Sequence, residues 1–158
     1  MADGPSRGAD DAGSSASHPL SAWDSPGFLL WHATLRWQRE MAAALRPLGL
    51  THVQFVLLAS TWRLASRGGR PSQRQLADHA GTNVMMTSQV VRSLEARGLL
   101  EREPDPRDTR MLRVAVTVEG EAIARRALTA VEDADRRYFS GVQQPEWLLA
   151  TLRTMAGR

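Results

Sequence analysis

The stretch from Ser72 to Val116 limits the fold of this chain more than any other part of the sequence. Ser72 is followed three residues later by Gln75, a capping box in which each side chain bonds the backbone N–H of the other residue. This pattern predicts that a short helix, Gln73–His79, begins here, and Gly81 is suited to end it in a tight turn. The stretch therefore opens with a helix and a sharp turn.

A second helix is predicted from Val84 to about Arg97. Asn83 is its N-cap candidate, and Gly98 stands where a left-handed C-cap residue is favoured. Its inward positions recur at intervals of three and four residues, which suits packing against a core. These positions are Thr87, Val90, Val91 and Leu94. Two helices of this size, separated by a tight turn, are typical of the helix-turn-helix.

Two strands, Leu99–Glu103 and Met111–Val116, are predicted directly after the second helix. Residues 105–110 between them read Asp-Pro-Arg-Asp-Thr-Arg, and proline and aspartate favour a turn. Arginines at such a tip suit the minor groove of DNA, where negative potential attracts them. The alternative is a solvated loop with local Asp–Arg pairs, which the position after a helix-turn-helix disfavours. The predicted fold class is mainly α with a small β-hairpin, a winged helix-turn-helix with terminal helices that form a dimerisation lobe.

This arrangement resembles the MarR-type winged helix-turn-helix transcriptional regulators. The residues that carry the resemblance are Leu76-Ala77, Gly81, Leu94-Glu95, Gly98-Leu99, the tip from Asp105 to Arg110, and Thr117-x-x-Gly120. The resemblance runs from about Ser25 to the C-terminus, and the tip in its place after the helices is its most specific part. It implies a homodimer in the bacterial cytoplasm that binds palindromic operator DNA as a repressor and is released by a small-molecule effector.

The second predicted helix is the one that helix-turn-helix proteins place in the major groove, with its first residues on base edges. Its outward positions near the start are Met85, Ser88, Gln89 and Arg92. Glutamine makes paired hydrogen bonds to adenine, arginine makes them to guanine, and methionine packs on the thymine methyl group. Ser88 or Thr82 is suited to holding a phosphate. If only part of this set faces DNA, Gln89 and Arg92 are the strongest candidates.

In the hairpin tip, the resemblance assigns a role to each charged residue. Arg107 matches the minor-groove arginine of the family, Asp105 matches the acid that holds it, and Arg110 matches the basic residue that ends the motif. Arg110 is equally suited to a structural pairing with Asp105 or Asp108, and spacing does not separate the two roles. Asp105 and Asp108 are therefore the expected wing-supporting residues.

The remaining predicted elements are helices. They run from Pro26 to about Arg46, from a capping box at Thr51 and Gln54 to about Leu64, from Thr117 to about Phe139, and onward from Pro145. The second of these is apolar over most of its circumference, which predicts a central, buried helix. Residues 1–24 are predicted to be a disordered tail before a MarR-type domain at 25–158. Within it, the winged helix-turn-helix occupies about 51–116, and the helices at 25–46 and 117–158 have surplus apolar surface, which predicts dimerisation.

Three of the tryptophans fall on the two helices before the helix-turn-helix. The family resemblance places an effector pocket between the dimer helices and the DNA-binding lobe. The residues expected to line it are Trp31, His32, Leu35, Gln38, His52 and Trp62. Aromatic walls with a few polar groups suit a small-molecule site, so the expected effector is an aromatic or amphipathic molecule. Aromatic residues at helical spacing are usually part of a core, however, and for any single one of Trp31, Trp37 and Trp62 a core role is favoured over a pocket role.

The composition narrows the function classes. The absence of cysteine removes disulfides, thiolate metal sites and thiol nucleophiles, whereas the six methionines can be oxidised but no sequence feature marks them as a sensor. All 20 basic residues are arginine. Residues 63–113 hold ten arginines against six acids, whereas residues 1–24 hold one arginine against four aspartates. A basic centre in the chain fits a nucleic-acid footprint.

Nothing in the sequence favours catalysis. The four histidines are not clustered for a metal, and no phosphate loop, nucleophile elbow or carboxylate pair is present, so no cofactor is expected. No apolar run of membrane-spanning length and no secretory signal is visible, so no membrane partner is expected. The favoured function is a sequence-specific regulator that binds double-stranded DNA. The alternative is a winged-helix protein-interaction or dimerisation module without sequence-specific DNA binding, against which the arginine-tipped hairpin argues.

Overall fold

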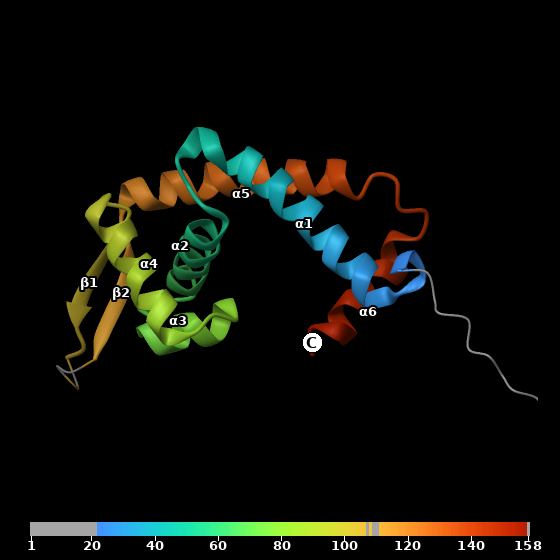
Figure 1. Cartoon of the computed structure of the whole chain (residues 1–158). Coiled ribbons are helices and arrows are strands. Elements are labelled where there is room, and N and C mark those ends of the chain that lie inside the picture. The colour runs from blue at the N-terminus through green and yellow to red at the C-terminus, as the bar shows by residue number, and fades with distance from the viewer. Residues whose placement is uncertain (1–21, 107, 109–110, 158) are drawn as a thin grey trace, which may run out of the picture. The chain divides into compact units, whose positions relative to one another are not determined.

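The computed structural model describes residues 22–106, 108 and 111–157, which belong to two compact units, Met1–Ala33 and Thr34–Arg158. In chain order (Figure 1), the elements are the 3-10 turn η1 (Ala22–Asp24), α1 (Pro26–Leu45), the 3-10 turn η2 (Arg46–Leu48), α2 (His52–Ala65), α3 (Gln73–Ala80), α4 (Val84–Ala96), β1 (Leu100–Pro104), β2 (Leu112–Val116), α5 (Val118–Tyr138) and α6 (Pro145–Met155). Every predicted helix and strand is present, with bounds that differ by at most one residue. The predicted fold class, mainly α with a small β-hairpin, is confirmed, whereas the dimerisation role of the terminal helices stays a prediction.

Helices α2, α3 and α4 begin directly after the N-cap residues that the sequence predicted. Thr51 Oγ1 accepts a hydrogen bond from the Gln54 N–H at 3.3 Å, and Gln54 Oε1 accepts one from the Thr51 N–H at 3.0 Å. The Ser72 capping box forms in the same reciprocal way. Asn83 Oδ1 accepts from the Met86 N–H at 2.7 Å. These bonds satisfy N–H groups that the first turn of a helix leaves without a partner, which explains the starts of α2, α3 and α4.

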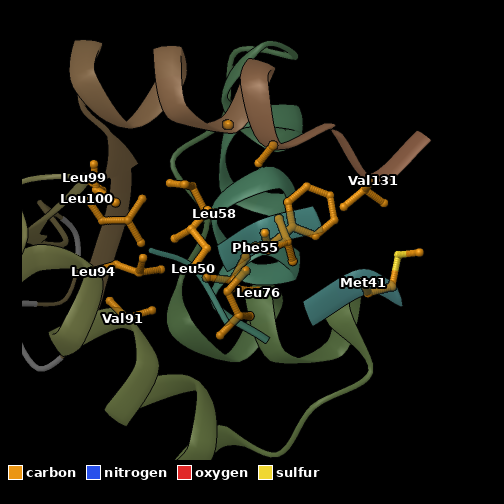
Figure 2. Close-up of a cluster of buried hydrophobic side chains, with 14 of the residues drawn as sticks. Met41, Leu50, Phe55, Leu58, Leu76, Val91, Leu94, Leu99, Leu100 and Val131 are labelled. Atoms are coloured by element: carbon orange, nitrogen blue, oxygen red, sulfur yellow. The ribbon is translucent and has the colours of Figure 1, made fainter. Parts of the chain in front are cut away.

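Helix α2 is the centre of the unit Thr34–Arg158. It packs against α3, α4, α5 and β2, and Leu57 and Leu58 are fully buried. Its one fully buried polar side chain, Thr61, donates its hydroxyl to Leu57 O at 2.8 Å, so that the core holds no unsatisfied hydroxyl there. Figure 2 shows the surrounding side chains, among them Met41, Leu50, Phe55, Leu76, Val91, Leu94, Leu99, Leu100 and Val131. The prediction that α2 is central and buried is confirmed.

The β-hairpin is attached to the start of α3. Strands β1 and β2 pair antiparallel along their whole length. The segment before α3 extends this pairing, because the Val114 N–H donates to Pro71 O at 2.9 Å and Ser72 forms an isolated bridge with Arg113. The hairpin and the helix-turn-helix are therefore joined through the backbone as well as through side chains.

Helix α5 begins directly against the junction of α4 and β1. Thr117 Oγ1 accepts from the Gly120 N–H at 2.9 Å and donates to Gly98 O at 2.7 Å. Gly120 lies so close to this junction that a Cβ atom built on it would be 1.9 Å from Leu99 O. A glycine is therefore required at position 120, and Thr117 and Gly120 together dock α5 onto the helix-turn-helix.

In the unit Met1–Ala33, the described residues are η1 and the start of α1. Residues 22–24, which the sequence predicted to be part of the tail, form a 3-10 turn instead. The physical reason is aromatic packing: Trp23 meets Phe28 edge-on at 5.1 Å and lies 5.2 Å from His32. The rest of the predicted tail, residues 1–21, lies outside the described residues.

Candidate nucleic-acid interface

The outward face of α4 carries the four residues predicted to read DNA bases. Met85 is 75% exposed, Gln89 and Arg92 are exposed, and Ser88 is half-buried. The buried side of the same helix consists of Thr87, Val91 and Leu94. Because positions 85, 88, 89 and 92 are spaced by three and four residues, they share one side of the helix. The structure therefore brings the four predicted side chains together on the surface.

Thr82 lies in the turn between α3 and α4. Its hydroxyl is 2.7 Å from that of the buried Thr87, which in turn donates to Asn83 O at 2.9 Å. These contacts hold the Thr82 side chain inside the turn. Of the two residues predicted to hold phosphate, Ser88 is the one that faces the groove described next.

A groove of about 410 Å³ runs from the face of α4 toward the hairpin. Its lining includes Gln73, Arg74, Ser88, Arg92, Arg102 and Met111. The sequence interpretation missed Arg74 and Arg102 as members of this surface. A signal was available for Arg74, which occupies the first turn of α3 away from the buried Leu76. No local pattern marks Arg102, because its position depends on how β1 packs beside α4.

The arginines of the groove differ in their partners. The Arg102 Nε and Nη2 atoms donate to Glu95 Oε2 at 2.8 and 2.5 Å, and these hydrogen bonds hold the pKa of the Glu95 carboxyl below its ordinary value. Within the described part of the chain, Arg74 and Arg92 form no ion pair. Two guanidinium groups thus remain available to an anion, and arginine is well suited to bind phosphate oxygens.

The predicted arginines of the hairpin tip, Arg107 and Arg110, lie outside the described residues, so their roles stay predictions. The neighbouring residues form a hydrogen-bonded turn. The Asp105 N–H donates to Met111 O at 2.8 Å, and the Met111 N–H donates to Asp108 O at 2.9 Å. Asp105 and Asp108 therefore both shape the base of the tip through their backbone atoms. Their predicted support of the tip arginines is not tested by these bonds.

The carboxylate of Asp105, which is 3% exposed, binds Arg113, a contact that the sequence did not predict. Arg113 Nε and Nη2 each lie 2.5 Å from Asp105 Oδ2. Arg113 Nη1 also donates to Arg70 O at 3.1 Å and to Gln75 Oε1 at 3.2 Å. Because Gln75 caps α3, one guanidinium group joins the hairpin to the start of the helix-turn-helix. The sequence analysis placed Arg113 only within the predicted strand Met111–Val116.

A separate cavity of about 500 Å³ lies beside α2. Its lining includes the apolar Phe55, Trp62 and Leu128 and the polar Ser60, Arg63 and His79. Trp62, over whose ring Arg125 lies at 5.0 Å, is the one predicted effector residue in this lining. The other residues predicted to line an effector pocket do not line this cavity. Leu35, Gln38 and His52 belong to the unit Thr34–Arg158, and Trp31 and His32 belong to the unit Met1–Ala33. Their effector role stays a prediction.

Trp37 and His52 pack against each other. Trp37 Nε1 donates to Asp135 Oδ1 at 2.7 Å, and the Trp37 and His52 rings meet edge-on at 5.0 Å. Burial lowers the pKa of His52 below its ordinary value, and the Asp135 carboxylate opposes this shift only in part. His52 is therefore neutral at neutral pH. This packing supports a core role for Trp37, which the sequence left open.

The described residues include no group of three or more His, Cys, Asp or Glu side chains placed to hold a metal ion. No single helix in the described ranges is long and apolar enough to cross a membrane.

Comparison with known proteins agrees with this geometry. Residues 50–112 match the family model described as the MarR family. The chain is similar to the uncharacterized HTH-type transcriptional regulator YdcH of Bacillus subtilis (strain 168), with 42% identity over 131 residues that cover 83% of this chain and 89% of YdcH. It is also similar to CouR from Rhodococcus jostii RHA1 bound to p-coumaroyl-CoA, with 29% identity, a TM-score of 0.75, and coverage of 87% of this chain and 95% of CouR. The transcriptional repressor CouR bound to a 23-mer DNA duplex matches with 26% identity, a TM-score of 0.76, and coverage of 88% and 99%.

Proposed function

Because the chain belongs to the MarR family of HTH-type transcriptional regulators, we propose that it is a homodimeric repressor that binds a palindromic DNA operator in the bacterial cytoplasm. Members of this family are transcriptional regulators rather than enzymes, as the sequence led us to expect. The observation that carries the proposal is the outward face of α4, with Met85, Gln89 and Arg92 exposed beside the groove that Arg74 lines. The DNA complex of the similar CouR supports duplex DNA as the partner.

Different parts of the proposed interface are suited to different parts of the DNA. The start of α4 is suited to the major groove, where Gln89 and Arg92 can bond base edges. Arg74, on the neighbouring first turn of α3, is suited to a phosphate of the DNA backbone, which positions the protein without reading sequence. Arg107, at the hairpin tip, is proposed to enter the minor groove and to contribute charge and shape readout.

We propose that a second copy of the chain covers the exposed apolar side chains of α6. Exposed apolar side chains of this helix include Trp147 (66% exposed), Leu149 (49%), Leu152 (38%) and Met155 (61%). An apolar pocket of about 230 Å³ at the α5–α6 junction is lined by Phe139, Val142, Pro145, Leu148, Leu149 and Leu152. The start of α1 also exposes Leu29, Leu30 and Trp31. Exposed apolar patches of this kind mark interaction sites, and a two-fold dimer would bury the patch on α6.

A binding experiment with the DNA that flanks the gene tests the proposed function. We expect the parent chain to shift a palindromic duplex with two chains per site. Gln89→Ala should weaken operator binding by about 1–3 kcal/mol per lost contact and leave the salt dependence nearly unchanged. Arg107→Ala should weaken operator and random DNA together, and reduce the salt slope by about one unit per lost ion pair, twice in a dimer. Fluorescence anisotropy at several salt concentrations measures both effects.

Arg126→Ala is the matched control, because this exposed arginine lies on α5 outside the proposed interface. It should change neither the operator affinity nor the specificity. Thermal melts establish that each variant is folded before its binding is interpreted. An Arg107→Ala variant with the affinity and salt slope of the parent would show that the hairpin tip does not touch DNA. If no flanking duplex is shifted at all, the alternative, a module that binds protein through its winged helix, is favoured.

We infer that the cavity beside α2 is the effector site and that it takes an aromatic or amphipathic organic acid. Phe55 and Trp62 provide aromatic surface, and Arg63 provides a cation for a carboxylate. His79 of α3 lines the same cavity, so a ligand held there would touch the helix-turn-helix directly. The similar CouR bound to p-coumaroyl-CoA supports an organic ligand for this fold.

Titration with aromatic acids such as hydroxybenzoates tests this site. We expect a binding acid to quench tryptophan emission and to weaken operator binding over the same concentration range. Trp62→Phe should remove most of the quench, and Arg63→Ala should raise the ligand Kd. Trp147→Phe is the control, because Trp147 lies on α6 and does not line this cavity, and it should leave the quench in place. If Trp62→Phe lowers only the melting temperature and the response to ligand persists, Trp62 is a core residue and the site lies elsewhere.

A further inference from the structure

Three methionine side chains are exposed at or next to the proposed DNA interface. Met85 is 75% exposed, and Met86 and Met111 are each 41% exposed, whereas Met41 in the core is fully buried. Val84, next to them in the first turn of α4, is 46% exposed as well. Long apolar side chains in water at the start of a helix contribute little to the core. Their placement is therefore better explained by contact with a partner.

Two of the methionines, Met85 and Met111, lie on surfaces that would meet DNA, and Met86 follows Met85 in the first turn of α4. Met85 shares one side of α4 with Ser88 and Arg92, and the Asn83 cap fixes the turn from which Met85 projects. Met111, at the start of the second arm of the hairpin, lines the same groove as Ser88 and Arg92. Both α4 and the hairpin thus place an exposed thioether beside residues that are proposed to meet DNA.

We propose that Met85, Met86 and Met111 form an oxidation-sensitive surface, at which a peroxide converts the thioethers to sulfoxides and thereby releases the protein from DNA. This inference rests on the proposed function, because it needs a DNA complex to release. The sequence has no cysteine, so methionine provides all of its sulfur. Sulfoxide formation is reversible by methionine sulfoxide reductases, which suits a regulatory modification.

The chemical step is a two-electron oxygen transfer. A lone pair of the methionine sulfur attacks one oxygen of hydrogen peroxide, the S–O bond forms and the O–O bond breaks. The leaving hydroxide takes up the proton of the transferred oxygen, so that one water is released for each sulfoxide. The sulfur is oxidised and the peroxide is reduced, and no further co-reactant is needed. Exposure sets the order of reaction, so Met85 should react before Met41.

Methionine sulfoxide should bind DNA less well than methionine, for a physical reason. A thioether packs against the methyl group of thymine, whereas a sulfoxide is polar and chiral and carries a partly negative oxygen. Near the phosphates this oxygen is repelled, and at the base edge it loses its apolar partner. The fold itself should survive, because the methionine of the hydrophobic core, Met41, is fully buried and protected.

The test compares DNA binding before and after treatment with hydrogen peroxide. Peptide mass spectrometry counts the sulfoxides at each methionine, and anisotropy measures the Kd for the operator duplex. The quantity of interest is the ratio of Kd after and before oxidation, so that a variant with altered starting affinity remains informative. We expect the parent ratio to be at least about ten, since loss of base contacts of this kind changes affinity by that order. The combined variant Met85→Leu, Met86→Leu, Met111→Leu should give a ratio near one.

Met155→Leu is the matched control, because Met155 lies on α6 outside the proposed DNA interface and is covered by the second copy in the proposed dimer, so this variant should leave the oxidation ratio as high as in the parent. Treatment of the oxidised parent with methionine sulfoxide reductases A and B should restore binding, and this readout does not depend on any variant. Full conversion of the three methionines with an unchanged Kd would overturn the inference, and so would an equal loss of binding in the triple variant. Failure of the untreated parent to bind any duplex would instead count against the proposed function.

Discussion

Gly120→Ala is expected to lower the free energy of unfolding by about 3 kcal/mol, because the added methyl group would collide with backbone. In a helix this exchange normally stabilises by about 0.5–1 kcal/mol. Here the new Cβ would lie 1.9 Å from Leu99 O and 2.8 Å from the carbonyl carbon. No rotation of a side chain relieves an overlap with backbone, so the steric cost outweighs the gain in helix propensity. Thermal unfolding should show a fall of roughly 2–4 °C for each kcal/mol lost.

The matched control for this experiment is Gly27→Ala. Gly27 also lies in the first turn of a helix, α1, but its Cβ would be 4.0 Å from the nearest atom, Ser25 Oγ. We expect this variant to melt at the temperature of the parent or slightly above it. If Gly120→Ala melts as high as the parent, α5 does not approach Leu99 in the way described, and the docking of α5 on the helix-turn-helix would need revision.

Arg113→Met is expected to detach the hairpin from α3 and to weaken operator binding by at least about tenfold. The substitution keeps an unbranched apolar stem but removes the guanidinium group that bonds Asp105, Arg70 O and Gln75. Removing one partner of a buried charged group costs about 2 kcal/mol in stability. A hairpin that is no longer held should present its tip to DNA in many orientations. Amide hydrogen exchange at Val114, whose N–H donates to Pro71 O, should become faster.

Arg70→Met provides the control for the loss of one arginine. The Arg70 side chain pairs with Glu103 on the surface, with 56% and 53% of the two side chains exposed, and exposed pairs contribute at most about 1 kcal/mol. Its backbone carbonyl, which accepts from Arg113, is retained. Val114 should therefore exchange as slowly as in the parent. Equal exchange rates and equal operator affinities in Arg113→Met and Arg70→Met would show that Arg113 does not hold the hairpin.

The sequence by itself determined the helices, because their signals are local. Thr51, Ser72 and Asn83 each cap a helix through a backbone N–H three residues later, and such a contact needs no distant partner. The burial of one side of α4 followed from the spacing of Thr87, Val91 and Leu94. The same spacing left Met85, Gln89 and Arg92 outside, so most of the proposed DNA-reading face was predictable.

Tertiary structure alone decided which distant residues meet. Trp37 and Asp135 are 98 positions apart, and their hydrogen bond turns an apparently apolar tryptophan into a bridge between α1 and α5. Arg113 and Gln75 belong to different elements, and their contact depends on the hairpin lying beside α3. Periodicity describes which side of an element is apolar, but it contains no information about which polar atoms of two elements come within hydrogen-bonding distance. Side-chain partners across the fold were therefore settled only when the helices and the hairpin had packed around α2.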